Sequence, residues 1–155
     1  MSRPMTSVMA AAALTIFGVA TGAAQTDNPR FGVWRMQSDA PPPASNIMTY
    51  EPYDDGGMRI TVASTNSSGR ESRWGYVTLF DGVFRTVTGQ ESAETAVEIV
   101  DERTTRILNK RNGRVTQIII NTLSEDHNTI NNEYIRFDDH GRITGVSHAV
   151  YQRIE

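Results

Sequence analysis

The sequence predicts an all-β protein built as a single antiparallel up-and-down barrel of eight to ten strands. From Asn46 onward, short segments that alternate apolar and polar residues follow one another, and Gly, Asn and Asp mark the turns between them. Beyond residue 24, no segment has the periodicity of an amphipathic helix. Regular short strands of this kind form a barrel or a sandwich, and closure into a barrel removes the exposed edges that promote aggregation.

The first 24 residues differ in character from the rest. Arg3 is their only charged residue, and an apolar run of 13 residues from Val8 to Ala20 precedes small residues that end at Ala24. This three-part pattern is typical of a secretory signal peptide that is cleaved after Ala24. The run is too short to cross a bilayer core of roughly 30 Å. We therefore expect a periplasmic or secreted protein and not an integral membrane protein.

The chain after the signal peptide is expected to form one domain. Residues 25–30 are polar and contain Pro29, which predicts a flexible N-terminal arm. The barrel domain then spans residues 31–155 and starts with a strand at Phe31–Gln37. Three consecutive prolines predict a stiff crossing loop at Ser38–Ser45, because proline has no backbone donor.

The remaining strands are predicted from alternation and turn signals. Asp81-Gly82 and Asn112-Gly113 favour tight reversals, because these residues tolerate positive φ. The expected strands, in chain order, are Asn46–Tyr53, Met58–Thr65, Glu71–Phe80, Val83–Thr88, Thr95–Asp101, Thr104–Lys110, Arg114–Leu123, Thr129–Phe137 and Arg142–Ile154.

Motifs in the first and last strands resemble a known group of barrels. Gly32-Val33-Trp34 and Val150-Tyr151-Gln152-Arg153 are similar to the lipocalin and fatty-acid-binding-protein (calycin-type) group, and the order of the turns resembles that of secreted bacterial lipocalin-like proteins. The resemblance implies that Arg153 lies over Trp34 as a plug of the barrel, next to Gly32. A guanidinium stacked on an indole gains about 0.5–2 kcal/mol. The alternative is that Trp34 is a plain core residue and Arg153 a solvated charge.

Two features depart from the fatty-acid-binding proteins. Those proteins place a ligand-holding Arg two positions before the tyrosine of the last strand, where this chain has Ala149. They also cap the barrel with two helices, where this chain has only the proline loop. Their carboxylate clamp is therefore not expected here.

Composition argues against several classes of function. The net charge of −3 provides no basic excess for nucleic acid, and the absence of cysteine removes disulfides and thiol chemistry. His127, His140 and His148 lack the spacing of metal ligands, and no serine lies in a nucleophile elbow. No metal, cofactor or catalytic residue is predicted.

The candidate ligand residues are Trp74, Tyr76, Phe80, Tyr134 and Arg136, which lie on same-side sets of strand positions. These sets mix large apolar groups with a few polar ones, as small-molecule pockets do. A filled core has the same composition, and the sequence does not fix which face points inward.

Three functions remain in view. The first is an exported, non-catalytic barrel that binds a small, mostly apolar molecule. The second is a cell-envelope structural or interaction module with a filled barrel, whose Ser38–Ser45 loop meets a protein partner. The third is a barrel enzyme such as an isomerase or cyclase, which would need buried ionisable residues clustered in the cavity.

Overall fold

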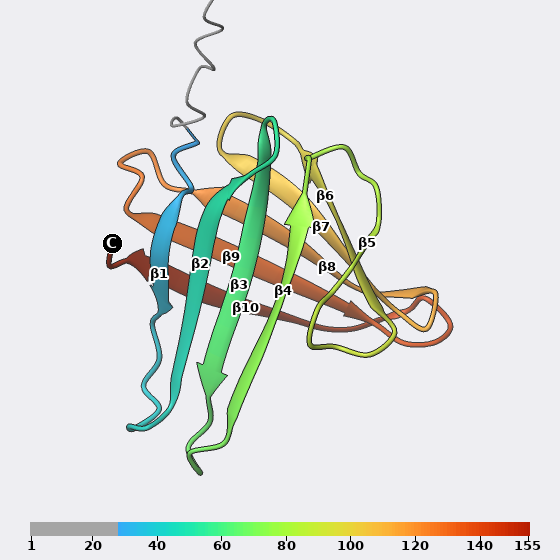
Figure 1. The fold of residues 1–155 in the computed structure, drawn as a ribbon. Helices are drawn as coiled ribbons and strands as arrows, with labels where there is room; N and C mark the ends of the chain where they lie inside the picture. Colours follow the sequence, from blue (N-terminus) through green and yellow to red (C-terminus); the bar gives the residue numbers. More distant parts are fainter. Residues whose placement is uncertain (1–27) are drawn as a thin grey trace, which may run out of the picture.

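The computed structural model describes residues 28–155, which form ten strands of one antiparallel sheet (Figure 1). The strands are β1 (Gly32–Met36), β2 (Ser45–Tyr53), β3 (Gly57–Thr65), β4 (Glu71–Thr78), β5 (Arg85–Thr86), β6 (Ala93–Ile99), β7 (Thr104–Arg111), β8 (Arg114–Leu123), β9 (Thr129–Phe137) and β10 (Ile143–Arg153). Their order in the sheet is β4-β3-β2-β1-β10-β9-β8-β7-β6-β5, so all pairs are consecutive in sequence except β1 with β10.

The predicted fold class is confirmed: the described residues form a nearly closed up-and-down barrel without helices. Four strands are shorter than expected: β1 and β10 each lose one residue at both ends, β4 ends at Thr78, and β5 contains only Arg85–Thr86. β6 has the expected length but starts two residues earlier, at Ala93. The predicted signal peptide and residues 25–27 lie outside the described residues. The expected flexible arm does not extend to Arg30, whose side chain is only 5% exposed. Its guanidinium bonds to the interior, so a polar residue before the first strand is part of the core.

Side chains alternate between the barrel interior and solvent along most strands. Met58, Ile60 and Val62 of β3 are buried, whereas Arg59 between them is exposed. The register pairs Tyr50 of β2 with Ile60. This two-residue period places large apolar groups of successive strands on one face, where they form a continuous core.

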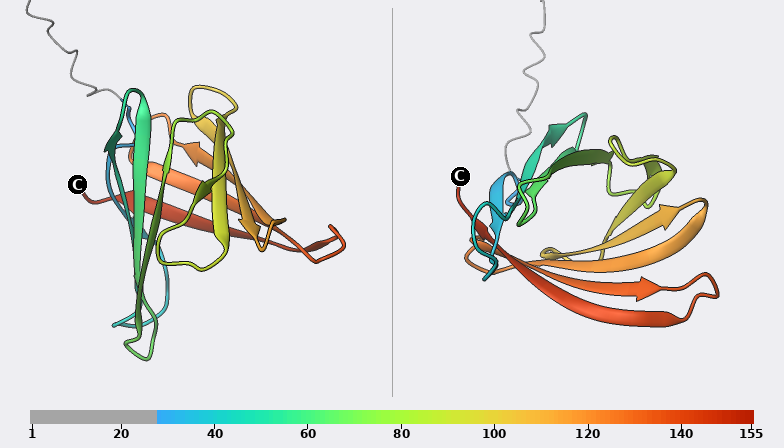
Figure 2. Two further views of the ribbon diagram at one scale, coloured as in Figure 1. Left: turned by 45° about the vertical axis from the view of Figure 1, so that its right-hand side comes forward. Right: turned by 90° about the horizontal axis from the view of Figure 1, so that it is seen from below.

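The two halves of the sheet cross each other and curl into a ring. Figure 2 shows this arrangement in the view from below, where the strands surround a central space. Within residues 28–155, no helix is long and apolar enough to span a membrane.

The ring closes incompletely between β4 and the β5–β6 hairpin. Gly75 of β4 and Thr88 form an isolated bridge, in which each backbone amide donates to the other residue's carbonyl at 3.0 and 2.8 Å. The joint between β4 and β5 is therefore the weakest seam of the barrel. On the other side of β4, a Cβ at Gly75 would lie 2.5 Å from the carbonyl oxygen of Ile60 in β3, so glycine at this position permits the close approach of β3 and β4.

Trp34 and Arg153 close one end of the barrel. Trp34 is 0% exposed, pairs with Arg153 in the β1–β10 ladder, and has the Arg153 guanidinium carbon 4.2 Å from its ring centroid. Arg153 Nε also donates to the carbonyl of His127 at 2.9 Å. Gly32 has φ of +136°, and a Cβ there would lie 2.5 Å from Arg153 Nη1. The stack therefore needs glycine at position 32.

Both members of the stack, Trp34 and Arg153, form hydrogen bonds to the segment before β1. Arg153 Nη1 donates to the carbonyl of Phe31 at 2.7 Å, and Nη2 donates to the carbonyl of Pro29. From inside, Trp34 Nε1 donates to the carbonyl of Arg30 at 2.9 Å. Because these hydrogen bonds pair the buried Trp34 indole and three carbonyls of the segment, the segment forms a stable floor. We call residues 28–34 together with Arg153 the floor.

We predict that Trp34→Ala lowers the free energy of unfolding by roughly 3–5 kcal/mol, because it deletes a fully buried large aromatic side chain. Urea denaturation followed by circular dichroism measures this loss. Trp74→Ala is the matched control, since Trp74 is only partly buried and should cost less. A loss below about 1 kcal/mol for Trp34→Ala, typical of exposed positions, would show that the indole does not support the floor.

Candidate functional site

The barrel contains a cavity of about 530 Å³ that reaches from buried side chains near the floor to exposed residues at the opposite end. Small-molecule pockets have volumes of about 300–1,000 Å³. The interior is therefore large enough for a ligand, and the barrel is not filled by its own side chains.

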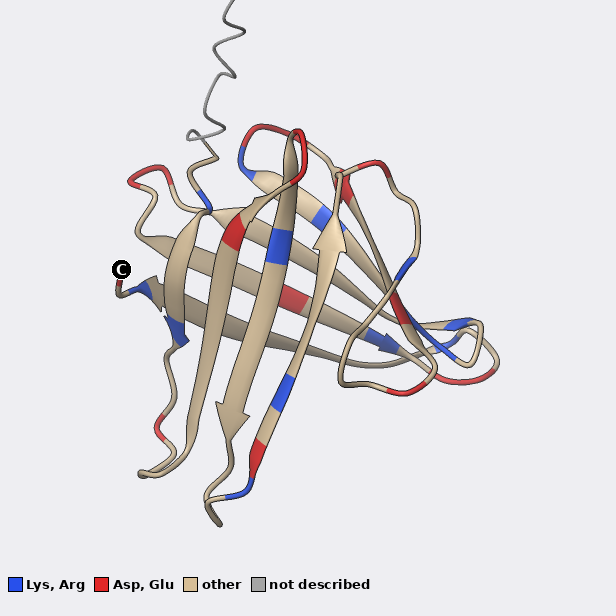
Figure 3. Ribbon diagram, viewed as in Figure 1, with Lys and Arg blue, Asp and Glu red and all other residues tan. Residues whose placement is uncertain are grey.

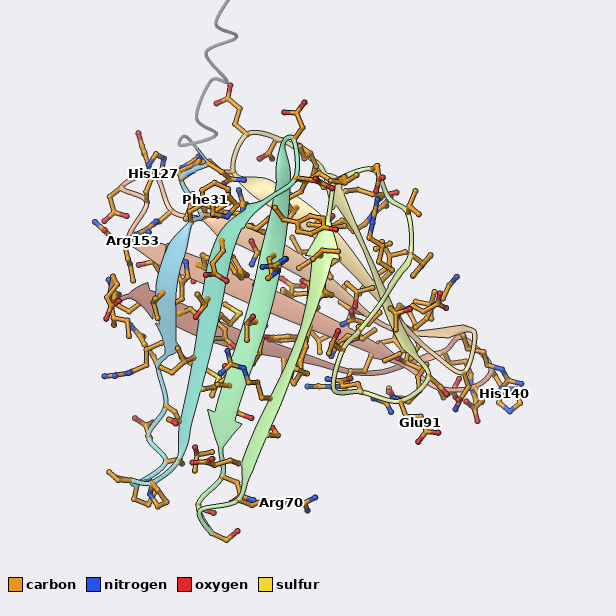
Figure 4. All side chains as sticks on the ribbon, in the orientation of Figure 1. Phe31, Arg70, Glu91, His127, His140 and Arg153 are labelled. Carbon is orange, nitrogen blue, oxygen red and sulfur yellow. The ribbon has the colours of Figure 1, made fainter. Side chains whose placement is uncertain are left out.

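The two ends of the barrel differ in what they expose. Figure 4 shows Phe31, His127 and Arg153 together at the floor end, and Glu91 and His140 at the hairpins of the other end. Gln90, Glu94, Lys110, Arg111 and Arg136 line the cavity at that second end, and we call this part of the cavity the mouth.

One wall of the cavity is largely apolar and aromatic. It comes from β2, β3 and β4 and includes Met48, Ile60 and Val62. Trp74 and Tyr76 extend it, with ring centroids 6.3 Å apart and planes inclined by 13°. Their faces offer a flat surface for the apolar body of a ligand.

The facing wall is lined by amides and hydroxyls of β6, β7 and β8. Thr95 Oγ1 donates to Asn109 Oδ1 at 2.8 Å, and Asn109 Nδ2 donates to Gln117 Oε1 at 2.9 Å. All three residues line the cavity. The interior is thus amphipathic, with one wall suited to apolar surface and another to polar groups.

A chain of hydrogen bonds runs inward from Arg30 at the floor. Arg30 Nε donates to Asn121 Oδ1 at 3.3 Å, Asn121 Nδ2 donates to Asn132 Oδ1 at 2.8 Å, and Asn132 Nδ2 donates to the Tyr134 hydroxyl at 3.1 Å. Asn121 and Asn132 face each other in the β8–β9 ladder. Only Asn132 and Tyr134 of this chain line the cavity, so Arg30 and Asn121 lie behind its wall.

Three further tyrosines surround the cavity. Burial raises the pKa of the Tyr50, Tyr76 and Tyr151 phenols well above the usual range. Their hydroxyls therefore stay protonated at neutral pH and act as hydrogen-bond donors. Burial also lowers the pKa of Arg30, although an arginine remains charged at any physiological pH.

The mouth carries more positive than negative charge. Glu94, Lys110, Arg111 and Arg136 line the outer part of the cavity. Lys110 Nζ lies 3.5 Å from the ring centroid of Phe84, so its position is fixed by an aromatic face. Figure 3 shows that acidic residues also occur in the nearby turns.

A groove outside the barrel borders the same aromatic residues. It has a volume of about 400 Å³ and follows the seam between β4 and β5. Trp74 and Tyr76 line both this groove and the inner cavity. At the seam between β4 and β5, the side chains of Trp74 and Tyr76 therefore lie between the inner cavity and the surface groove.

The structure brings most of the predicted ligand residues together. Trp74, Tyr76, Tyr134 and Arg136 all line the cavity. Phe80 does not, because β4 ends two residues earlier and Phe80 adopts φ of +58° and packs against the core. The predicted plug residues Gly32, Trp34 and Arg153 lie in the floor as described above.

Several interior residues were missed from the sequence. Arg30 appeared to belong to the arm, and Tyr50, Asn121 and Asn132 were not selected as site residues. Asn121 follows the apolar run Ile118–Ile120 within a predicted strand. A polar amide directly after such a run indicates a buried residue that takes part in a hydrogen-bond network, because a buried amide needs partners. Arg30 carries no comparable local signal.

The three histidines do not contribute to the cavity. His127, His140 and His148 are exposed, and none lines the cavity. Within residues 28–155 there is no group of His, Cys, Asp and Glu side chains arranged to hold a metal ion.

Comparison with known proteins identifies the class of fold. No family model and no curated protein matches the chain. Among solved structures, a single-residue variant of the fluorescent protein UnaG aligns with a TM-score of 0.57 and 10% sequence identity. The alignment covers 82% of this chain and 97% of the UnaG chain. Wild-type UnaG has a TM-score of 0.55 and 10% identity, covering 79% and 96%. The protein therefore shares the fold of these β-barrels, and its barrel encloses a cavity of ligand size.

We predict that stability falls as pH rises above about 10. The folded-state pKa values of Tyr50 and Tyr76 lie above the value of about 10 expected for the unfolded chain. The folded state therefore binds these protons more tightly. This contribution is fully present below pH 10 and is lost as pH rises through the folded-state pKa values. Urea unfolding between pH 8 and 11.5 measures it, and the double variant Tyr50→Phe/Tyr76→Phe should flatten the decline. Constant wild-type stability up to pH 11 would contradict the burial of these phenols.

Proposed function

We propose that the protein is an exported barrel that holds a small, mostly apolar molecule in its interior and does not transform it. The observation that carries this function is the cavity of about 530 Å³, which extends from the exposed mouth to the buried tyrosines. The aromatic wall supplies apolar contact area, and the polar wall supplies a few groups that fix orientation. This combination is typical of carriers of small molecules.

The filled-barrel alternative is less well supported. A structural or interaction module would need no internal space, and a cavity of this size gives up packing contacts that would stabilise a filled barrel. An enzyme is also less well supported. The acidic and basic residues that line the cavity, Glu94, Lys110, Arg111 and Arg136, lie in its outer part, where solvent screens them. The buried tyrosines stay protonated at neutral pH because burial raises their pKa values.

Ligand binding is tested by titrating the purified protein with a panel of fatty acids, quinones and porphyrins. We expect at least one to shift the melting temperature and to change tryptophan fluorescence in a saturable way. The fluorescence response should come from Trp74, which lines the cavity, because Trp34 is sealed in the floor. Trp74→Phe should therefore remove the optical response and retain the thermal shift. No response to the whole panel would contradict the proposal.

A blocked cavity provides the matched control for that titration. Val62→Phe adds bulk on the aromatic wall, whereas Val146→Phe adds the same bulk at a position that is 53% exposed. We expect Val62→Phe to weaken binding at least about tenfold, which corresponds to about 1.4 kcal/mol, and Val146→Phe to leave it unchanged. Circular dichroism establishes that both variants are folded. Equal affinity in the two variants would place the ligand outside the barrel.

Export is the second part of the proposal. Expression of the full chain in a Gram-negative host should yield periplasmic protein with an intact mass that starts at Gln25. Leu14→Arg, which breaks the apolar run, should keep the protein uncleaved in the cytoplasm. Retention of the full mass of the unaltered chain in the cytoplasm would contradict export.

A further inference from the structure

Arg30 is the one charged side chain that is buried among residues 28–155. Its guanidinium donates to the Asn121 side chain and to the carbonyls of Arg103 and Asn121. None of the ion pairs in the described region includes it. A buried charge is costly unless an opposite charge compensates it. The Arg30 guanidinium is therefore a positive charge behind the polar wall that no direct ion pair neutralises, and only the more distant Asp101 acts on it as an opposite charge.

This charge fixes the direction of the hydrogen-bond chain. Arginine can only donate, so Asn121 must turn its carbonyl oxygen toward Arg30. The Asn121 amide nitrogen then faces Asn132, which must accept with its own oxygen and donate to Tyr134. Tyr134 accepts from Asn132 at its oxygen and also lies against the Tyr151 hydroxyl, so its proton can be donated either to Tyr151 or into the cavity. The chain thus ends at the cavity wall in a hydroxyl donor.

Two neighbouring hydroxyls lack a good acceptor. Tyr50 is 4% exposed; its oxygen faces the Asn121 amide, and its proton is directed only to the sulfur of Met48 at 3.7 Å. A thioether is a weak acceptor. Tyr76 is 8% exposed, and the structure shows no hydrogen bond of its hydroxyl to another group within residues 28–155; its neighbours there are the Tyr50 and Tyr134 phenols. Both tyrosines line the cavity. Buried polar groups without partners are rare, and they indicate a missing acceptor in this space.

We propose that the hydroxyls of Tyr50, Tyr76 and Tyr134 form a subsite for an acceptor oxygen, anionic or carbonyl, of the bound molecule. Arg30 does not touch the ligand in this arrangement. It is a positioning residue that orients the donors and biases the subsite toward an anion. The inference rests on the proposed function and adds the chemistry and orientation of the ligand, whose acceptor group points toward the floor.

The mouth is compatible with entry of an anion. Lys110, Arg111 and Arg136 outnumber Glu94 among the charged residues that line it. Long-range attraction of this kind raises the rate of capture without fixing the bound position. Binding of the anion at the mouth itself is the competing arrangement, and variants at the two ends separate the two.

The test uses three probes that share a naphthalene body and differ in their polar group. These are 2-naphthoate, methyl 2-naphthyl ketone and (2-naphthyl)methylammonium, titrated into the purified protein by calorimetry. We expect naphthoate to bind most tightly and the ammonium most weakly, with at least a tenfold difference between them. The ketone should lie between the two, because it is a neutral acceptor.

Variants assign this preference to the floor. Asn121→Asp keeps the shape of the side chain and places a carboxylate against Arg30, so we expect the naphthoate-to-ammonium preference to fall at least tenfold. Tyr50→Phe and Tyr76→Phe should each weaken naphthoate and ketone binding together. Tyr53→Phe is the matched control, since Tyr53 ends β2 outside the cavity lining, and it should change nothing. Arg30→Met removes the charge itself and should lower the same preference if the variant folds. If it does not fold, the Asn121→Asp result alone decides the role of Arg30.

Each outcome decides the proposal. Equal binding of the three probes, or tightest binding of the ammonium, would overturn the acceptor subsite and leave the carrier function intact. A loss of naphthoate preference in Arg136→Met but not in Asn121→Asp would place the anion at the mouth and overturn the floor subsite. Failure of all three probes to bind would count against the subsite and the proposed function together.

Discussion

The contact between Trp34 and Arg153 is the interaction on which the rest of the structure depends. It joins the first strand to the last, and so converts a ten-stranded ribbon of hairpins into a barrel. The stack leaves the guanidinium donors free, and they hold the segment before β1 through the carbonyls of Phe31 and Pro29. Without this floor, the chain would keep its hairpins but would have no closed end against which an interior could form.

The floor also determines the chemistry of the interior. The segment that closes the barrel carries Arg30, and closure places this cation behind the polar wall. An arginine imposes its donor character on every amide connected to it, so the interior presents hydroxyl donors toward the cavity. The same contact that stabilises the barrel thus accounts for the amphipathic character of the cavity, which has apolar strands on one side and oriented donors on the other.

Much of the fold could be predicted from the sequence, because strand alternation and turn residues are local signals. The segments Arg114–Leu123 and Thr129–Phe137 were predicted with the boundaries that the structure shows. Phe80 was misplaced, because a strand can end inside an alternating pattern without any change in composition. Phe80 instead has a positive φ in the turn that follows β4.

The candidate site was less predictable than the fold. Trp74 and Tyr134 could be selected because large aromatics at alternating positions indicate an interior face, although the sequence did not fix which face pointed inward. Arg30 and Asn121 could not be linked, because 91 residues separate them along the chain and only closure of the barrel brings them together. Long-range polar contacts of this kind leave no trace in local periodicity.

A double-mutant cycle between Trp34→Leu and Arg153→Met tests the central claim most directly. Unfolding free energies of the wild type, both single variants and the double variant give the coupling between the two side chains. Our account predicts a coupling of about 0.5–2 kcal/mol, the range of a desolvated cation–π contact. Additivity of the two substitutions within about 0.3 kcal/mol would contradict a barrel that is closed by this pair.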